Sequence, residues 1–279
     1  MPHFKKIPRT VVILAVLATF GLLRAPFENR LGRDLINTKM VIPPPGLTVL
    51  DQMGQSALMA TLGGLRPLVA SFMSLRGYEN FSEKNWDELH QTYQVITALE
   101  PREEFHWVNA VWHLGINATA NMELDTTLTE FERKRRFFNY AQQAIEFADK
   151  GIDQIPYSVE IRKQVAEVYR EKLKDWSNAA KTYGEIKDLD GAPQYAERFY
   201  GYFLAKVPGR EREAYDYLKG LYDEGEDQHL PTLIYEIRRL EEILKIPYPE
   251  RIPEADADRN RGHPNKPKSN PLPGGVVIP

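Results

Sequence analysis

The sequence contains no cysteine among its 279 residues. This absence excludes disulfide bonds, thiolate nucleophiles, cysteine-ligated zinc, iron–sulfur clusters and covalently attached c-type haem. The chain also lacks an excess of positive charge, because it contains 36 Lys and Arg residues and 39 Asp and Glu residues, which gives a net charge of -3. Nucleic acid is therefore not expected as a partner.

Catalytic signatures are missing as well. No Ser-His-Asp order, phosphate-binding loop or Rossmann fingerprint stands out in the sequence. No two carboxylates share an apolar setting that would separate their pKa values. We therefore expect no catalytic residue, cofactor, metal ion or small-molecule substrate, and we predict that the chain is not an enzyme.

The N-terminus has the pattern of a secretory signal. A basic segment over residues 1–9 precedes an unbroken apolar run from Thr10 to Leu23, and this order is typical of such signals. Cleavage after Ala18 would divide the apolar run, so we predict an uncleaved signal anchor that spans the membrane over residues 10–27. A cleaved signal and a buried core helix are the alternatives.

Basic residues flank the predicted anchor on both sides, so the positive-inside rule gives little guidance on its orientation. They are Lys5, Lys6 and Arg9 before it and Arg24, Arg30, Arg33 and Lys39 after it. The signal-like order favours an N-terminus in the cytoplasm. We therefore predict a single-pass protein of the bacterial inner membrane, with the bulk of the chain facing the periplasm.

Two segments precede the main body of the chain. Residues 28–50 form a juxtamembrane spacer that contains Pro43-Pro44-Pro45-Gly46, a stiff extended sequence. An apolar stretch from Ala57 to Leu75 follows, interrupted by two glycines and a proline. It predicts two short helices within residues 51–81 that either cap the core or rest on the membrane surface. A second membrane span is the alternative.

Residues 82–246 consist of amphipathic segments separated by proline or glycine, without the alternation of strands. Ser82 is the predicted N-cap of the first helix, whose buried stripe is Trp86, Leu89, Tyr93, Ile96 and Leu99. The helix after Pro101 is predicted to bury Phe105, Val108, Trp112 and Ile116. Helices joined by short connections predict an all-α solenoid.

A long helix is predicted from about Thr129 to Gly151, with Phe137 and Phe138 on its core side. The basic run Arg133-Lys134-Arg135-Arg136 wraps around the start of this helix, so we interpret it as a solvated first part of the helix. Residues 247–279 are rich in proline, charge and glycine. Such a composition buries too little apolar area to offset the entropy of ordering, which predicts a disordered tail.

The spacing of the helical segments indicates a repeat. Pro156 to Pro193 covers roughly 37 residues and Gly191 to Gly225 roughly 34. The residues that fit best are Trp86-Asp87-Glu88-Leu89 with Tyr93, and Trp176, Ala179, Ala180 and Tyr183. This region resembles tetratricopeptide (TPR) repeats, which implies an α-solenoid of helical hairpins whose concave face holds peptide segments. The pair between Pro101 and Pro156 is longer, which predicts an insertion or extended helices.

A second resemblance concerns the segments Leu62-Gly63-Gly64-Leu65-Arg66, Leu75-Arg76-Gly77 and Glu100-Pro101-Arg102. Their order is similar to that in bacterial membrane-anchored repeat proteins. It implies an envelope protein and no defined activity.

One polar face is the candidate peptide-binding surface. Its members recur with 4-3-4-4 spacing on the helix after Pro101, opposite the expected Trp112 stripe: Arg102, His106, Asn109, His113 and Asn117. The TPR resemblance places such a helix on the concave face, where asparagine amides can donate to and accept from an extended backbone. An ordinary solvated face is the alternative. His106 and His113 stand about 10.5 Å apart along a helix, too far to share one metal ion.

A second candidate surface is rich in tyrosine. Tyr200 and Tyr202 fall off the apolar stripe of Tyr195, Phe199 and Phe203, so we predict that they are exposed anchors for a partner.

These features together predict a membrane-anchored, TPR-like scaffold or adaptor that binds a partner protein or peptide in the bacterial cell envelope. One alternative is a structural subunit of a larger envelope assembly, of the secretion, pilus or polysaccharide-export type, with contacts through the tyrosine-rich pair and the tail. A less favoured alternative is an α-helical enzyme, which would need a closed pocket with clustered carboxylates and histidines.

Overall fold

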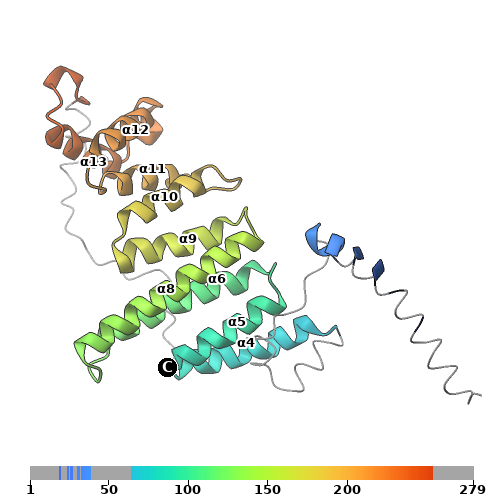
Figure 1. Cartoon of the computed structure of the whole chain (residues 1–279). Helices are drawn as coiled ribbons and strands as arrows, with labels where there is room; N and C mark the ends of the chain where they lie inside the picture. Colours follow the sequence, from blue (N-terminus) through green and yellow to red (C-terminus); the bar gives the residue numbers. More distant parts are fainter. Residues whose placement is uncertain are drawn as a thin grey trace, which may run out of the picture. The chain divides into compact units, whose positions relative to one another are not determined.

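The computed structural model describes residues 64–253, together with Thr19, Arg24, Pro26, Phe27, Arg30, Leu31 and residues 33–38. Every regular element in this part of the chain is helical (Figure 1), which confirms the all-α class. Among these same residues, no helix combines the length and the apolar character needed to cross a bilayer. Most of the predicted anchor at 10–27, the first of the two short apolar helices and residues 254–279 of the predicted tail lie outside the described residues. The disorder predicted from residue 247 is wrong for residues 247–253, because Tyr248–Glu250 form a 3-10 turn and Ile252 is buried, with its N–H donating to Glu241.

After residue 63 the described chain forms two compact units. The first contains residues 64–73 and 94–101, and its small core comprises Val69, Ala70, Val95 and Leu99, with Met73 packed against them. The second contains residues 74–93 and 102–253. Two helices, α4 (Arg66–Ser82) and α5 (Trp86–Leu99), contribute to both units.

The junction between α4 and α5 differs from the prediction. Ser82 is the last residue of α4, and its hydroxyl donates to the carbonyl of Tyr78 at 2.9 Å, so the predicted N-cap role of Ser82 is wrong. Lys84 then takes up a left-handed backbone with φ 60°, and α5 begins at Trp86. The predicted stripe of α5 is confirmed, because Trp86, Leu89, Tyr93, Ile96 and Leu99 are all buried.

The rest of the second unit is a succession of helices (Figure 1). In order they are α6 (Glu104–Trp112), the π-helix η1 (His113–Ala118), α7 (Thr119–Leu124), α8 (Glu130–Gln154), α9 (Val159–Glu167), the π-helix η2 (Val168–Leu173), α10 (Trp176–Lys187), α11 (Tyr195–Leu204), α12 (Glu211–Asp223), the 3-10 turn η3 (Glu226–Gln228), α13 (Pro231–Ile243) and the 3-10 turn η4 (Tyr248–Glu250). Contacts run between helices that are close in the sequence: α6 packs on α8 and α9, α8 on α9, and each later helix on the next.

The helix pair between Pro101 and Pro156 is longer than the repeat because its helices are extended. The α6, η1 and α7 segments follow one another directly from Glu104 to Leu124, and α8 has 25 residues. Thr129 starts α8 as a capping box, with its hydroxyl accepting the Glu132 N–H while the Glu132 carboxylate accepts the Thr129 N–H. The helix predicted from Thr129 to Gly151 is thus confirmed and ends a few residues later.

The buried side of α6 is not the predicted one. Phe105 and Trp112 are 65% and 42% exposed, whereas Trp107, Ala110, Val111, Leu114 and Ala118 are buried. The prediction followed the largest apolar residues, but packing here favours the small ones. A Cβ at Gly115 would lie 2.4 Å from Val168 Cγ2, so only a residue without a side chain allows η1 to approach η2 this closely.

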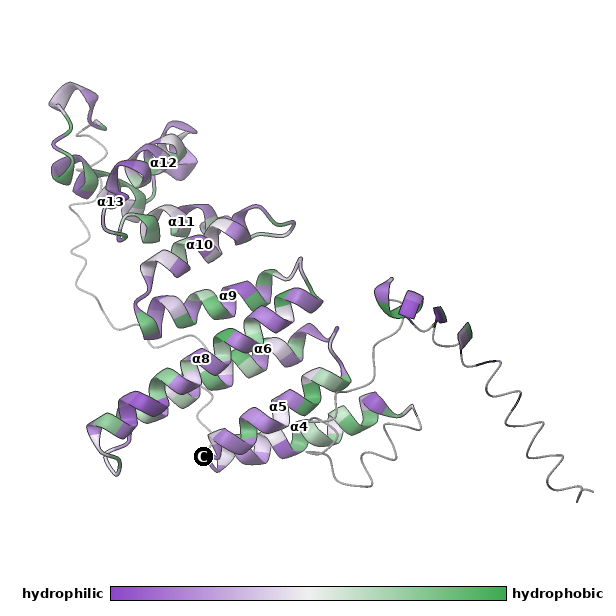
Figure 2. Ribbon diagram, in the orientation of Figure 1, coloured by the Kyte–Doolittle hydropathy of each residue, from purple (hydrophilic) through white to green (hydrophobic). Residues whose placement is uncertain are grey.

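The assignment of Phe138 to the core side of α8 is also wrong. Phe138 is 58% exposed, while the buried aromatic residues of this helix are Tyr140 and Phe147. Figure 2 shows the first turns of α8 as mainly hydrophilic, because the basic run lies there. Lys134, Arg135 and Arg136 are exposed, in agreement with a solvated start of the helix.

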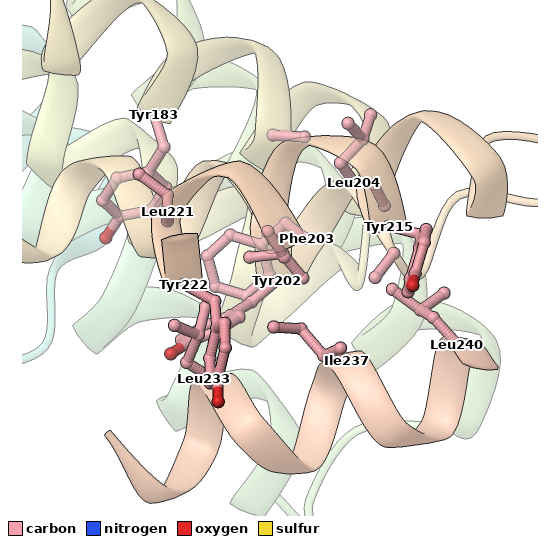
Figure 3. Close-up of a cluster of buried hydrophobic side chains, with 14 of the residues drawn as sticks. Tyr183, Tyr202, Phe203, Leu204, Tyr215, Leu221, Tyr222, Leu233, Ile237 and Leu240 are labelled. Carbon is pink, nitrogen blue, oxygen red and sulfur yellow. The ribbon is translucent and has the colours of Figure 1, made fainter. Parts of the chain in front are cut away.

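A large core lies among α10, α11, α12 and α13, and we call it the C-terminal core (Figure 3). Its buried residues include Tyr183, Tyr202, Phe203, Leu218, Tyr222, Leu233, Ile237 and Leu240. Helix α11 comes very close to α12, since a Cβ at Gly201 would lie 2.3 Å from Leu218 Cδ2. Burial of this many large side chains is the main stabilising contribution in this part of the unit.

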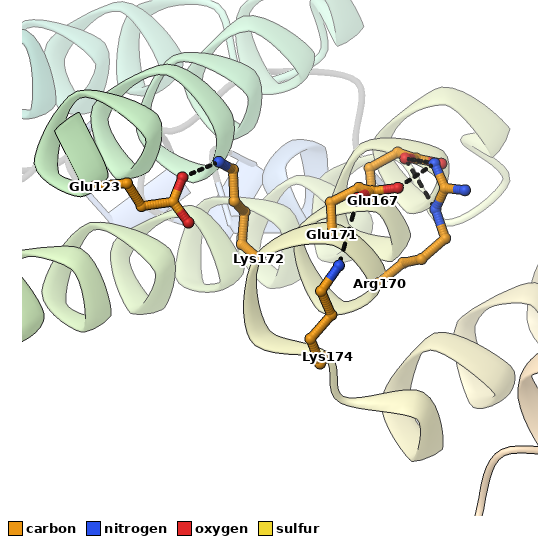
Figure 4. Close-up of polar contacts among 6 residues, drawn as sticks. All are labelled: Glu123, Glu167, Arg170, Glu171, Lys172 and Lys174. Carbon is orange, nitrogen blue, oxygen red and sulfur yellow. Dashed lines mark hydrogen bonds and ion pairs between the residues drawn. The ribbon is translucent and has the colours of Figure 1, made fainter. Parts of the chain in front are cut away.

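Ion pairs lie at the surface around η2, and one of them connects η2 to α7 (Figure 4). Lys172 of η2 reaches Glu123 of α7 at 2.8 Å, Lys174 reaches Glu171 at 3.6 Å, and Arg170 pairs with Glu167. Such pairs near water contribute about 0–1 kcal/mol each. They are therefore secondary to the apolar packing.

Candidate functional site

The residues of the predicted peptide-binding face lie on two consecutive elements, α6 and η1, and just before them. Arg102 is exposed and precedes α6, His106 and Asn109 are half-buried on α6, and His113 and Asn117 are half-buried on η1. Within this set, a hydrogen bond joins Asn117 to His113, with Asn117 Nδ2 3.4 Å from His113 Nδ1. This bond keeps His113 and Asn117 on the same side of η1, which is a π-helix and not the regular helix that the 4-3-4-4 spacing assumed.

His113 lies among aromatic rings. Its ring centroid is 4.5 Å from that of Phe81, 5.1 Å from Trp112 and 5.8 Å from Tyr93. Burial lowers the pKa of His113 to about 4, because imidazolium is poorly solvated there. The ring is therefore neutral near pH 7, and its Nδ1 accepts from the Asn117 amide. His113 acts here as a packing residue of the interior.

The two tyrosines of the second candidate surface have different environments. Tyr202 is only 8% exposed and belongs to the C-terminal core, and burial raises the pKa of its phenol to about 12. The expectation that it is exposed is wrong, because α11 has helices packed on more than one side. Tyr200 is half-buried, with its ring 4.7 Å from that of Tyr217 in an edge-on arrangement.

The second unit also contains an open polar hollow of about 610 Å³. Its walls come from three segments: the start of α5, the end of α7 with the loop after it, and the first half of α8. The residues that line it are Lys84, Asn85, Trp86, Asp87, Glu88, Asn121, Met122, Leu124, Asp125, Thr126, Thr127, Arg136 and Tyr140. A smaller depression lined by Asp87, Arg135, Arg136, Asn139 and Tyr140 adjoins it through shared residues.

Two hydrogen bonds between distant segments fix the walls of the polar hollow. The indole N–H of Trp86 donates to Asn121 Oδ1 at 2.8 Å, and the Tyr140 hydroxyl donates to Asp87 Oδ1 at 3.1 Å. Burial and the Asp87 carboxylate together raise the pKa of Tyr140 to about 12, against a smaller opposing effect of Arg136. Tyr140 is thus a hydrogen-bond donor at any physiological pH.

The loop at the edge of the polar hollow is held by its own side chains. Thr127 donates its backbone N–H and its hydroxyl to Asp125 Oδ1, at 2.9 and 2.6 Å. These bonds keep the pKa of Asp125 below its usual range. The hollow therefore presents carboxylates at Asp87, Glu88 and Asp125 and cations at Lys84 and Arg136. This mixture suits recognition of a polar or charged chain.

The sequence reasoning missed the polar hollow because its residues come from segments that lie far apart in the chain. Asp87 and Tyr140 are 53 positions apart, and Trp86 and Asn121 are 35 apart. The sequence offers only weak signals for this region, namely the basic run that includes Arg136, which we interpreted as a solvated start of the helix, and the threonines at 126, 127 and 129. Among the residues that the structure describes, no group of three or more histidine and acidic side chains has the arrangement of a metal site.

Comparison with known proteins yields no family for this chain: no family model matches it, and no curated protein matches it significantly.

Proposed function

We propose that this chain is a membrane-anchored scaffold with a TPR-like solenoid, which binds a partner protein or peptide in the bacterial cell envelope. The packing of each helix of the second unit on its sequence neighbours supports the solenoid. The solenoid is also supported by the agreement between the predicted helix pairs and the observed ones. Helices α9 and α10 lie between Pro156 and Pro193, and helices α11 and α12 lie between Gly191 and Gly225.

The observation that carries the proposal is the polar hollow. It is open, its walls are held by hydrogen bonds between separate helices, and it offers donors and acceptors of both charges. An extended peptide has backbone groups and side chains that match such a surface. Binding would arise from shape and several moderate contacts, as in most protein interfaces.

A crosslinking experiment in the native membrane tests this function. A photoreactive residue at Thr126, an exposed position at the edge of the hollow, is expected to give one discrete adduct with the partner. The matched control is the same residue at Lys181, an exposed position of α10, which is expected to give none. Equal crosslinking from both positions would show that the polar hollow is not the binding site.

Charge variants test whether binding depends on the charged residues of the polar hollow. Asp87→Asn combined with Arg136→Glu is expected to abolish the Thr126 adduct, because the two charges that face a bound peptide are removed or reversed. Asn retains an acceptor for the Tyr140 hydroxyl, so the wall remains in place. Arg212→Glu, at an exposed arginine paired with Asp216 on α12, is the control and is expected to leave the adduct unchanged.

The anchor over residues 10–27 and the periplasmic location belong to the same proposal. They are tested by a two-state topology reporter fused after Pro247, with the size of the fusion checked on a gel. An exported, full-length fusion supports the envelope scaffold. A cytoplasmic reporter would mean an inverted anchor or a second membrane span at Ala57 to Leu75, and the partner would then have to be sought inside the cell.

A further inference from the structure

The second unit has a further pocket beside the start of α8, which we call the α8 pocket. It has a volume of about 360 Å³, at the small end of the range for ligand pockets. Its residues come from the end of α7 and the first half of α8. Met122 lines both this pocket and the polar hollow, so the two sites are neighbours.

Three apolar residues line the α8 pocket. Met122 is 3% exposed and Phe137 is half-buried, whereas Phe138 is 58% exposed. The two phenyl rings lie edge-on, with their centroids 5.3 Å apart. Phe131 is also exposed and stands seven positions before Phe138, which puts it on the same side of α8. An incoming apolar side chain therefore buries exposed aromatic surface here, which favours binding.

The α8 pocket also has charged walls, in which both carboxylates are paired. Glu130 Oε1 lies 2.6 Å from the ammonium of Lys134, which lines the same pocket. Glu123 Oε2 lies 2.8 Å from the ammonium of Lys172, which reaches it from η2 (Figure 4). The remaining charged residue of the pocket is Arg133. Its positive charge is therefore not neutralised by the carboxylates of the pocket.

The guanidinium of Arg133 makes no hydrogen bond or ion pair with any residue that the structure describes. Its sequence neighbour Glu132 accepts from the Thr129 hydroxyl at 2.8 Å. The hydrogen bond and the charge of Lys134 lower the pKa of Glu130, and Arg133 adds only a smaller effect. Arg133 Nε is shielded from solvent, but the two terminal nitrogens are not among the shielded unpaired atoms. They can therefore donate to both oxygens of a carboxylate, the geometry that arginine favours.

We propose that the α8 pocket binds a segment of the partner in which a large apolar side chain lies beside a carboxylate side chain. The apolar side chain packs on Phe137 and Phe138, and the carboxylate accepts from the terminal nitrogens of Arg133. The inference rests on the proposed function, because it names the chemistry of the partner. In an extended chain, side chains two positions apart point to the same side. The expected motif is therefore an apolar residue and an acidic residue with one residue between them.

A protein segment fits the α8 pocket better than a free amphipathic acid does. A pocket for a small ligand buries most of the ligand surface, whereas this one is small and open, with Phe138 exposed at its wall. A protein segment continues beyond the pocket. It can cover Phe131 on the same side of α8, and it can also reach the polar hollow, with which the pocket shares Met122.

Binding of matched peptides to the full chain tests the inference. The chain is held in nanodiscs of phosphatidylcholine, which has no net charge, and binding is followed by fluorescence anisotropy. Three end-blocked peptides carry Phe-Ser-Glu, Phe-Ser-Gln or Ala-Ser-Glu between Gly-Ser spacers, with the same dye at the same end. The Phe-Ser-Glu peptide is expected to bind roughly five- to tenfold more tightly than either of the others.

Two variants assign this preference to the pocket. Arg133→Gln is expected to bind the Glu and Gln peptides alike, and Phe138→Ala to bind the Phe and Ala peptides alike. Arg135→Gln is the matched control, because it removes the same charge from the same basic run at an exposed residue outside the pocket. It is expected to change the affinity for the Phe-Ser-Glu peptide less than about twofold. Circular dichroism confirms that each variant keeps its helices.

Three results would overturn the inference. Equal affinity of the natural chain for the Glu and Gln peptides would show that Arg133 does not select a carboxylate. An equal loss with Arg135→Gln would assign binding to the charge of the basic run as a whole. Octanoate that binds in calorimetry with dependence on Arg133, while none of the peptides binds, would identify the ligand as a free amphipathic acid.

The Thr126 adduct distinguishes this inference from the proposed function. An adduct at Thr126 without preference for the Phe-Ser-Glu peptide would refute the α8 pocket and leave the polar hollow as the partner site. Preference for that peptide without a Thr126 adduct would refute the polar hollow and support the α8 pocket as a separate site.

Discussion

The C-terminal core and the region around the polar hollow belong to the same unit but differ in how many of their aromatic side chains are exposed. In the C-terminal core the tyrosines face inwards, so that Tyr183, Tyr202 and Tyr222 are all buried. On the first half of α8, which forms one wall of the polar hollow, Phe131 and Phe138 are exposed among charged residues, whereas Trp86 and Tyr140, which line the hollow itself, are buried. A concentration of aromatic residues therefore does not mark a binding surface by itself, because helices packed on several sides bury even their off-stripe positions.

The helices of the second unit also begin differently. Side chains cap α8, α9 and α10 through Thr129, Ser158 and Asp175, and α10 is the one capped helix of the four around the C-terminal core, since the N-cap residues of α11, α12 and α13 make no side-chain cap bond. In the C-terminal core, tertiary packing fixes the helices. At the polar hollow, local hydrogen bonds must do more of this work, since the first turns of α8 have few buried residues.

The largest expected effect comes from the C-terminal core. Leu218 is fully buried against Gly201, and Leu218→Ala is expected to lower the free energy of unfolding by about 3 kcal/mol, through lost transfer energy and a cavity. Urea unfolding followed by tryptophan fluorescence measures this loss, since Trp176 stacks on Phe203 in the same core. Phe138→Ala on the first half of α8 is expected to lower the free energy of unfolding by less than about 0.5 kcal/mol. Equal losses at the two sites would contradict the proposed difference between the two regions.

A second effect depends on pH and arises from His113. Its pKa is about 4 in the folded protein, against an ordinary value of 6.5 for a solvated histidine, so the unfolded chain binds the proton more strongly. The contribution of neutral His113 to the free energy of unfolding is therefore fully present above pH 6.5, and it is lost as the pH falls from 6.5 towards 4. The loss between pH 7 and 5 is at most about 2 kcal/mol.

The variant His113→Leu tests this origin. It removes the titrating group, so its unfolding free energy is expected to change less between pH 7 and 5 than that of the natural chain. Burial also lowers the pKa of His90, which contributes in the same direction and stays in both proteins. A pH dependence that is the same in both proteins would assign the acid sensitivity to other groups.

Much of the helical order could be predicted from the sequence. Proline and glycine marked the ends of α9 to α12, and the 3-4-3-3 spacing identified five buried residues of α5, although it missed Val95, which is buried in the small core of the first unit. On α6 apolar residues occur all around the helix. Which of these residues are buried then depends on the helix that packs against them. Ala110 and Gly115 are buried in place of Phe105 and Trp112 because η2 approaches that side, and the local sequence pattern does not reveal this neighbour.

The polar hollow illustrates the same limit for the candidate site. Asp87, Asn121 and Tyr140 are ordinary residues in their own segments, and only the packing of α5 and α7 on α8 brings them to one cavity. The prediction for His113 and Asn117 assumed a regular helix, and the π-helical turn η1 altered the register at that point. The burial of Tyr202 could not be predicted from its position on α11, because it depends on the packing of more than one helix against α11.

The smallest effect that we predict concerns the start of α8. Thr129→Ala removes both the bond from the Glu132 N–H and the bond from the Thr129 hydroxyl to the Glu132 carboxylate, and it is expected to cost about 1 kcal/mol. Faster amide exchange is expected in the first turn of α8, because that turn has little buried surface to hold it.

The matched control is Gln194→Ala, at the N-cap of α11, where no side-chain cap bond exists and a loss below about 0.5 kcal/mol is expected. Exchange at the start of α11 should then stay as slow as in the natural chain, since the C-terminal core holds that helix. If Gln194→Ala cost as much as Thr129→Ala, local capping would matter equally in both regions. The proposed division between a packed core and a locally capped rim of the polar hollow would then be wrong.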